Sequence, residues 1–397
     1  MDYNYLILGA GQQGTAAAYD LARWGEAERV TLGDLELERA EAAAARVNRL
    51  LGRRIAQAQQ LDVSAIRTLE EKLRPYDLCL SAVPYYFNLA IAQAALAAQT
   101  GFCDLGGNTA IVRGELALDQ QARQAGITIV PDCGLAPGLA NILAVYAMER
   151  LEQMGGRPQE MRIYCGGLPQ KPRSPLGYKL VFSIEGLTNE YLGPVYVLRR
   201  GQVKVIESLS EREELLFPPP LGRLEAFTTS GGSSTCPWSF QGRLDSYEYK
   251  TLRYPGHLAQ LKTLVGLGLL SQEPVELAGQ PVVPQELFHR VAAPHLSFPA
   301  DEDLVVLRVR CIGQGDDAPL EVQYDLLDYQ DRTTGFSAME RLTGFPAAIV
   351  AAMCAQGQIG PGACLLEQAV PAGQFMSELL RRGIKPIETS VKGADNG

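Results

Sequence analysis

The feature that most constrains this chain is a glycine-rich turn near its N-terminus. The hexapeptide Gly9-Ala10-Gly11-Gln12-Gln13-Gly14 follows an apolar run at residues 3–8 and precedes an alanine-rich segment that ends at Trp24. A strand, this glycine spacing and a helix, in that order, indicate a dinucleotide-binding unit. The first glycine permits the tight turn, the second lets the backbone approach a pyrophosphate, and the third lets the helix lie close to the strand.

An acidic residue after the second predicted strand indicates which dinucleotide binds. Asp34 follows the strand at residues 30–33, about 20 residues after the last glycine, where an acid binds the ribose hydroxyls. Glu36 and Glu38 add negative charge that would repel a 2′-phosphate, so the sequence favours NAD. Arg39 is the nearby base and leaves room for NADP. The alternative is a structural glycine turn followed by a solvated acid.

Predicted strands and helices alternate from residue 3 to residue 131, which is typical of a doubly wound parallel sheet in an α/β protein. The pattern changes after Asp132. Between residues 162 and 253, runs of valine, tyrosine and leucine alternate with Pro/Gly breaks, which indicates an antiparallel sheet. Two more strands are predicted at residues 304–313 and 321–329, and helical patterns return at residues 337–356 and 373–382. The sequence thus predicts a Rossmann domain and a second α+β domain.

Residues that follow the third and fourth predicted strands are expected at the cofactor. Asp62 and Val63 would lie beside the adenine, although Asp62 serves equally well as a cap for the next helix. The fourth strand lies at the point where the strand order reverses, so its end is expected beside the nicotinamide. That end consists of Ser81, Ala82, Val83 and Pro84.

The composition excludes several classes of partner. The net charge is −9 and no run of Lys or Arg exceeds two residues, so nucleic acid and anionic membranes are poor partners. Neither a signal peptide nor an apolar stretch of membrane-spanning length is expected, and we predict a cytoplasmic protein. The eight cysteines form no CxxC pair and the three histidines form no ligand cluster, so no metal site is predicted.

Several motifs in the second half of the chain resemble one enzyme family. The sharpest is Lys250-Thr251-Leu252-Arg253-Tyr254-Pro255-Gly256-His257. The other motifs lie at residues 132–141, 178–186, 225–232 and 343–347. Together they resemble the saccharopine reductase and lysine 6-dehydrogenase family over nearly the whole chain, and the short lysine 6-dehydrogenases look most similar.

This resemblance implies a bilobed homodimer in which a substrate and dimerisation domain is inserted into the dinucleotide domain. The implied boundaries are residues 1–133 plus 337–397 for the dinucleotide domain and 134–336 for the inserted domain. The implied chemistry takes place at a C–N bond: hydride leaves the carbon that bears an amine, and water opens the resulting imine.

Such chemistry needs groups that hold the amine and move protons. Asp104 ends a predicted strand at the edge of the sheet, where it is expected to hold the substrate ammonium or act as base, unless it caps the following turn. Asp132 ends the next strand and could bind the amine end of a substrate. His257 could relay protons near neutral pH, although a lone histidine is often structural.

Other residues are candidates for substrate binding. Arg253 would clamp a carboxylate bidentately. Lys179 is either a buried base or an exposed residue, and Asn108 either orients an amine or shapes a turn. Tyr85 and Tyr86 could each form a wall of the pocket. Cys133 could line the same site or belong to the core.

The leading hypothesis is NAD-dependent oxidative deamination of the ε-amine of L-lysine, which releases ammonia and the 6-semialdehyde. The alternatives are a saccharopine reductase or a carboxyspermidine-type dehydrogenase. Saccharopine would need partners for two further carboxylates, and the basic residues near the motifs are few, namely Arg253, Lys250 and Lys179. A dinucleotide sensor without turnover and a thiol-dependent dehydrogenase that uses Cys133 are alternatives of other classes.

Overall fold

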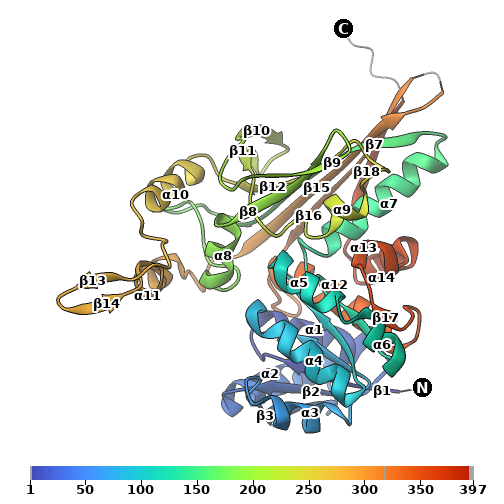
Figure 1. Cartoon of the computed structure of the whole chain (residues 1–397), viewed down its shortest axis with the longest axis vertical. Helices are drawn as coiled ribbons and strands as arrows, with labels where there is room; N and C mark the ends of the chain where they lie inside the picture. The colour runs from blue at the N-terminus through green and yellow to red at the C-terminus, as the bar shows by residue number, and fades with distance from the viewer. Residues whose placement is uncertain (1, 317, 393–397) are drawn as a thin grey trace.

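The computed structural model describes residues 2–316 and 318–392, which form two lobes (Figure 1). The lower lobe in that view contains a seven-stranded sheet with the order β17-β6-β5-β4-β1-β2-β3, in which each strand runs parallel to its neighbours. The order reverses between β1 and β4, as the dinucleotide-binding prediction requires. Its strands are β1 (Tyr3–Leu8), β2 (Ala27–Asp34), β3 (Ala56–Gln60), β4 (Leu78–Ser81), β5 (Gly101–Asp104), β6 (Thr128–Val130) and β17 (Gly362–Ala363).

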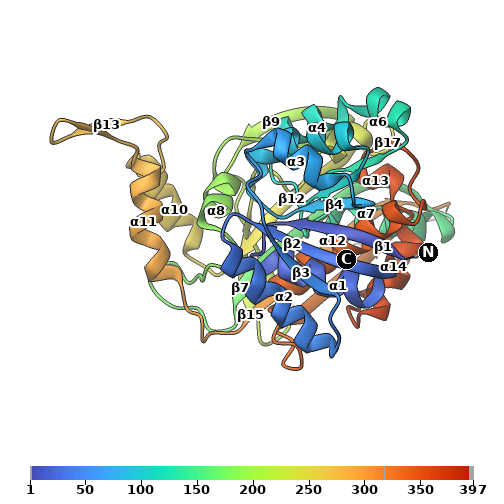
Figure 2. The same cartoon turned by 90° about the horizontal axis from the view of Figure 1, so that it is seen from below.

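Helices cover both faces of this sheet (Figures 1 and 2). They are α1 (Gln12–Trp24), α2 (Leu37–Leu51), α3 (Ile66–Leu73), α4 (Asn88–Ala98), α5 (Thr109–Leu116), α6 (Asp119–Ala125) and α12 (Ala338–Ala355). The Asn108 side chain caps α5, which begins at the next residue, Thr109.

Helix α12 returns from the far end of the chain to the first lobe and lies against α1, β4 and β5. A Cβ at Gly344 would lie 2.7 Å from the Cβ of Ala16, so glycine allows the two helices to approach closely. In length and composition α12 could span a membrane, contrary to the expectation that no segment could, but 83% of its most apolar window is buried in the protein. Its hydropathy therefore reflects its place in the core.

The upper lobe contains a nine-stranded sheet with the path β10-β11-β12-β7-β15-β16-β18, to which β8 and β9 are added beside β12. The sheet is mixed and not purely antiparallel, because β12 and β7 run parallel. Strand β18 pairs with β16 and so lies outside the lobe to which the sequence analysis had assigned residues 337–397. The strands are β7 (Arg157–Pro169), β8 (Pro194–Arg199), β9 (Gln202–Glu207), β10 (Glu213–Phe217), β11 (Gly222–Phe227), β12 (Ser246–Arg253), β15 (Asp303–Gln314), β16 (Pro319–Tyr329) and β18 (Ile387–Lys392).

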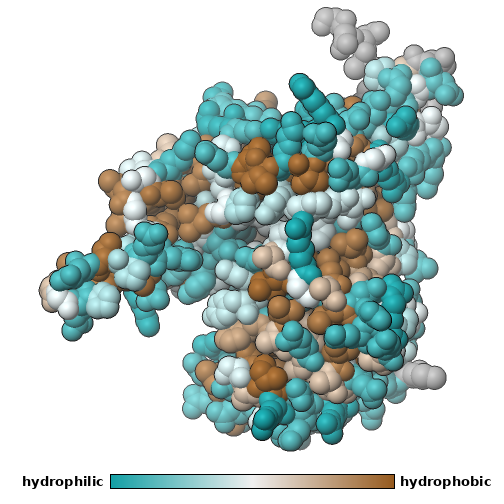
Figure 3. Space-filling view, viewed as in Figure 1, coloured by the Kyte–Doolittle hydropathy of each residue, from teal (hydrophilic) through white to brown (hydrophobic). Residues whose placement is uncertain are grey.

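The remaining helices connect the lobes or extend from them. They are α7 (Leu139–Gln153), α8 (Ile184–Tyr191), α9 (Cys236–Ser239), α10 (His257–Gly266), α11 (Pro284–Leu296), α13 (Leu366–Ala369) and α14 (Ala372–Arg381). Helix α11 and the hairpin of β13 (Val275–Leu277) and β14 (Gln280–Val282) project from the body as an arm, which the sequence analysis did not predict (Figures 1 and 2). Apolar side chains are exposed on and near this arm (Figure 3), including Leu267, Val275, Leu277, Leu287 and Val291.

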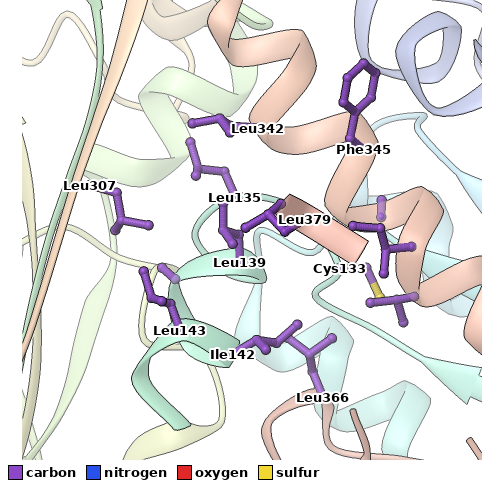
Figure 4. Packing of buried hydrophobic residues seen from close by; sticks show 14 of the residues in the cluster. Cys133, Leu135, Leu139, Ile142, Leu143, Leu307, Leu342, Phe345, Leu366 and Leu379 are labelled. Carbon is purple, nitrogen blue, oxygen red and sulfur yellow. The ribbon is translucent and has the colours of Figure 1, made fainter. Parts of the chain in front are cut away.

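One hydrophobic core joins the two lobes. Leu139 and Leu143 of α7 lie in the same buried cluster as Leu307 of β15 and Leu342 of α12 (Figure 4). Burial of apolar surface stabilises a fold by roughly 25 cal/mol per Å². A shared core therefore holds the edge of the parallel sheet in a fixed place against the mixed sheet.

Candidate functional site

A cavity of about 320 Å³ lies between the two lobes. The first lobe contributes the segments that follow β4, β5 and β6, so this wall is the carboxyl edge of the parallel sheet at its switch point. The second lobe contributes β7, β12 and α8. Ligands of open α/β sheets bind at this kind of position.

The glycine-rich loop has the geometry that a dinucleotide needs. Gly9 has a φ of +94°, and a Cβ there would lie 2.8 Å from the carbonyl oxygen of Ala82. A Cβ at Gly14 would lie 1.9 Å from the carbonyl oxygen of Gly9, so only glycine permits this close approach of helix to strand. A Cβ at Gly11 would meet nothing within 4 Å, which leaves open space where a pyrophosphate is expected.

The first turn of α1 also has features that fit a bound dinucleotide. Gly11 caps the helix without a side-chain hydrogen bond, Gln12 is exposed, and Gln13 lines the cavity. Both polar atoms of the Gln13 amide are buried without a hydrogen-bond partner in the described chain. A buried amide without a partner is costly, so Gln13 fits a role as a ligand contact.

The two acids predicted at the cofactor have different surroundings. Asp34 ends β2, where its carboxylate accepts hydrogen bonds from the backbone N–H groups of Ala10 (2.8 Å) and Glu36 (3.0 Å). It thus lies beside the glycine-rich loop, and its contact with the ribose hydroxyls stays a prediction. Asp62 accepts hydrogen bonds from the backbone N–H and the hydroxyl of Ser64, and these bonds lower its pKa. This is the turn-capping role, while Val63 packs against buried apolar residues of the first lobe, such as Leu61 and Leu69.

The segment after β4 forms part of the cavity wall. Ala82, Val83 and Pro84 line it, whereas the hydroxyl of Ser81 is buried and donates to Oδ1 of Asn88 at 2.8 Å. Tyr86 lines the cavity and is 57% exposed. Tyr85 lines it as well.

Arg253 reaches the cavity from the end of β12. Its Nε donates to the hydroxyl of Tyr191 (3.0 Å), its Nη1 to the carbonyl of Leu252 (3.0 Å), and its Nη2 lies 3.4 Å from Oε2 of Glu190. The guanidinium also lies over the ring of Tyr178, 4.9 Å from its centre. These contacts orient a cation whose remaining N–H groups are available to a carboxylate.

His257 does not reach the cavity, contrary to the expectation of a proton relay. It is 1% exposed, its Nε2 lies 2.9 Å from the hydroxyl of Tyr191, and its Nδ1 lies 3.0 Å from the carbonyl of Leu176. Burial, and then the charge of Arg253, lower its pKa to about 3. The ring is therefore neutral at physiological pH and supports Tyr191.

Asp104 and Asp132 also lie beneath the cavity and not in its lining. Asp104 is fully buried and accepts hydrogen bonds from the backbone N–H groups of Gly106 (2.5 Å) and Asp132 (3.2 Å). Asp132 is 4% exposed and accepts from the hydroxyl of Ser234. Burial raises the pKa of both carboxyls, that of Asp104 to about 6. Both carboxylates hold the loop that carries Gly106 and the turn after β6. The sequence therefore predicted this region of the cavity wall, but not which side chains face the cavity.

Three other candidates lie outside the cavity lining. The Asn108 side chain accepts from the backbone N–H groups of Ala110 (3.1 Å) and Ile111 (3.3 Å), which is a capping role. The half-buried Lys179 donates to the carbonyl of Asp301. Cys133 is 1% exposed, and burial raises the pKa of its thiol well above the usual range, so the thiol-dependent alternative is not supported.

Apart from Arg253, the main polar residues of the second wall were not predicted from the sequence. Glu185, Asn189 and Glu190 come from α8, and Cys165, Tyr249 and Thr251 come from β7 and β12. Glu185 and Glu190 with Arg253 are the charged side chains among the described lining residues. The segment at residues 178–186 was noted for its resemblance, and the helix that begins within it was the signal that could have located Glu190.

The described residues contain no group of three or more His, Cys, Asp or Glu side chains placed to hold a metal ion. The prediction of no metal site concerns the whole chain and stays a prediction.

Two family profiles cover most of the chain. The one described as "Saccharopine dehydrogenase NADP binding domain" matches residues 5–130, and the one described as "Saccharopine dehydrogenase C-terminal domain" matches residues 134–384.

Curated relatives and a solved structure agree with these profiles. A saccharopine dehydrogenase [NADP(+), L-glutamate-forming] from Pyricularia oryzae is 28% identical over 221 residues, which is 54% of this chain and 48% of the relative. The mitochondrial alpha-aminoadipic semialdehyde synthase of Bos taurus is 25% identical over 73% of this chain and 38% of the relative. The chain thus spans about half the length, or less, of these relatives. The apo saccharopine dehydrogenase (L-Glu forming) of Saccharomyces cerevisiae shares the fold, with a TM-score of 0.78 and 21% identity over 98% of this chain and all of that one.

Proposed function

Because the chain belongs to the saccharopine dehydrogenase family, we propose that it is a nicotinamide-dependent oxidoreductase that acts on a carbon–nitrogen bond. The observation that carries the proposal is the cavity between the lobes, which joins the carboxyl edge of a dinucleotide-binding sheet to the charged residues of the second lobe. A sensor without turnover would not need this second wall.

The cofactor is a nicotinamide dinucleotide, and we propose NAD. Asp34 lies beside the glycine-rich loop, and Glu36 and Glu38 follow it, so a 2′-phosphate would meet like charge. Arg39 is paired with Glu36 at 3.2 Å, which reduces its availability to a phosphate. The profile description and the Pyricularia relative name NADP, which makes cofactor preference a direct test of this chain's own residues.

We propose L-lysine as the substrate. The cavity lining contains one guanidinium and two carboxylates among the described residues, so the wall carries a net negative charge. Lysine has one carboxylate and two amines, whereas saccharopine has three carboxylates. A cavity with one cationic partner therefore favours lysine over saccharopine.

When bound, the oxidised nicotinamide supplies the hydride acceptor. The residues after β4 would place the carbon that bears the ε-amine beside the ring, in the cavity between the lobes. The ε-ammonium first gives up a proton to solvent water, and the carbon then loses a hydride while the freed nitrogen lone pair forms the C=N bond. Water then adds to the carbon, which gives the 6-semialdehyde and ammonium.

The experiment is formation of NADH or NADPH, followed by absorbance, with the purified protein, one oxidised cofactor and one amine. The panel contains L-lysine, saccharopine, ornithine and carboxynorspermidine. Turnover of lysine with release of ammonia supports the proposal. Turnover of saccharopine or carboxynorspermidine alone would replace it with one of the alternative reactions, and binding of NADH without turnover of any amine would favour a sensor.

A homodimer and a cytoplasmic location remain predictions for this chain. Sedimentation velocity of the purified protein tests the first, with a single species at twice the chain mass as the expected result. Fractionation of the source cells tests the second.

A further inference from the structure

The second wall of the cavity places a cation beside an anion. Arg253 and Glu190 present opposite charges side by side, with 3.4 Å between Nη2 and Oε2. A charge-assisted hydrogen bond between such groups is usually about 2.7–2.9 Å long. The pair is therefore loosely engaged, and each partner keeps bonding capacity for a ligand.

The Arg253 side chain is fixed by other contacts. It is 4% exposed, and the hydroxyl of Tyr191 and the carbonyl of Leu252 accept two of its five N–H groups. His257 holds the same tyrosine hydroxyl at 2.9 Å. The guanidinium therefore keeps its orientation whether or not Glu190 is bonded to it.

Glu190 is positioned by the helix that carries it. The Nδ2 of Asn189 donates to the carbonyl of Gly107 at 2.8 Å, which ties α8 to the loop after β5. The backbone N–H of Ser230 donates to the carbonyl of Glu190 at 2.9 Å. The Glu190 side chain is 30% exposed, and it lines the cavity, so its carboxylate remains accessible.

An α-amino acid carries its own opposite charges on adjacent atoms. Its carboxylate and its α-ammonium are attached to one carbon, so they match a cation and an anion that lie a few ångströms apart on a protein wall. Glu185, the other acid of the cavity, is exposed and lies at the start of α8, one and a half turns away from Glu190. It does not form part of this pair.

We propose that Arg253 and Glu190 form a recognition site for the zwitterionic head group of an α-amino acid: Arg253 binds the carboxylate and Glu190 binds the α-ammonium. This inference rests on the proposed function, since the ε-amine of the bound molecule is then left to point away from the pair. Glu190 is a substrate-binding residue in this assignment and does not take part in hydride transfer.

The test compares two ligands that differ at one group. L-lysine and 6-aminohexanoate both have a carboxylate and a terminal amine, but the second lacks the α-ammonium. Calorimetric titration into the full-length protein saturated with NADH measures both affinities without turnover. We expect lysine to bind the unaltered protein roughly 10- to 100-fold more tightly, since a hydrogen bond to a charged group contributes that much.

The variant Glu190→Gln should reduce this ratio to near one, and Glu190→Asp, which keeps the charge, should retain part of it. Glu248→Gln is the matched control, because Glu248 pairs with Arg199 at 2.7 Å outside the cavity, and it should keep the full ratio. NADH affinity and the melting temperature of each variant report whether it is folded. Steady-state turnover should show a raised KM for lysine in Glu190→Gln with little change in kcat, because the contact is the same in the ground and transition states.

Three results would overturn the assignment. The unaltered protein could show no preference for lysine over 6-aminohexanoate, Glu190→Gln could keep the full preference, or Glu185→Gln could lose as much of the preference as Glu190→Gln does. Failure of the proposed function is distinguishable from these. A preference for lysine that depends on Glu190, without any NADH formation from NAD and lysine, would refute the proposed reaction and leave the head-group site in place.

Discussion

The guanidinium of Arg253 lies 3.4 Å from the carboxylate of Glu190, although 63 residues separate them in the chain. Arg253 ends β12 and Glu190 lies near the end of α8. Neither residue alone defines a site, but the pair provides adjacent opposite charges on one wall of the cavity.

The KM for lysine should depend on pH through the ionisation of Glu190. Burial raises its pKa to about 7, against the opposing effect of Arg253. A carboxylate binds an ammonium only when it is ionised, so KM should fall as pH rises through about 7, and Glu190→Gln should lose this dependence. The other groups near Glu190 do not titrate in this range, because Arg253 stays charged and burial raises the pKa values of Tyr178, Tyr191, Tyr249 and Cys165. Initial rates from pH 6 to 8.5 check this, and an unchanged profile in the variant would contradict it.

Arg253→Lys should raise the KM for lysine about 10- to 100-fold, because an ammonium cannot reproduce the planar, bidentate contact of a guanidinium with a carboxylate. The affinity for NADH should stay the same. Arg199→Lys is the matched control, since Arg199 is paired with Glu211 and Glu248 outside the cavity. Equal kinetics for the Arg253 variant and the control would refute the carboxylate contact.

The glycines of the cofactor loop should respond differently to alanine. Gly14→Ala would place a Cβ 1.9 Å from the carbonyl oxygen of Gly9, so it should lower the melting temperature by several degrees, as a loss of 1–3 kcal/mol does in a protein domain. Gly11→Ala meets no atom within 4 Å and should keep the melting temperature but weaken NADH binding. Thermal melting and fluorescence titration with NADH measure the two effects. Tight NADH binding by Gly11→Ala would argue against a pyrophosphate at this position.

His257 should affect stability in acid and not the pH profile of turnover near neutrality. Its pKa is about 3 in the folded protein, while an unfolded histidine titrates near 6.5. The unfolded chain therefore binds more protons between these values, so this residue's stabilising contribution is full above pH 6.5 and is lost as pH falls towards 3, by at most about 1.4 kcal/mol per pH unit. Denaturant unfolding at several pH values measures this slope, which His257→Gln should reduce. A shift of the turnover profile between pH 6 and 8 in that variant would restore the proton-relay hypothesis.

Asp34→Ser should weaken NADH binding by about tenfold, the effect of losing a charge-assisted hydrogen bond to the ribose hydroxyls, and should improve NADPH binding relative to NADH. The carboxylate also accepts from the N–H of Ala10, so thermal melting must show that the loop remains folded. Fluorescence titration with both reduced cofactors gives the ratio. An unchanged ratio would mean that Asp34 does not select the cofactor.

The sequence by itself determined the dinucleotide-binding domain. A local pattern of strand, glycine turn, helix and acid specifies this unit because each glycine meets a steric demand from atoms only a few residues away, such as the carbonyl of Gly9 against Gly14. The net charge of −9 is also read directly from the sequence, and it makes nucleic acid and anionic membranes poor partners whatever the fold. The return of the C-terminal helices to the first lobe was implied by the resemblance and not by a local pattern, and α12 lies against α1, β4 and β5.

The tertiary structure decided which polar residues reach the cavity. Asp104, Asp132 and His257 carry the right chemical groups, but whether a group is exposed depends on what is placed over it by distant segments. The loop at Gly106 covers Asp104 and Asp132, and Tyr191 and Leu176 enclose His257. The sequence around Glu190 indicates a helix but not the role of this residue, because that role depends on a contact with Arg253 that forms only when α8 lies beside β12. Local sequence determines backbone conformation, whereas burial and charge pairing depend on packing between segments that are far apart in the chain.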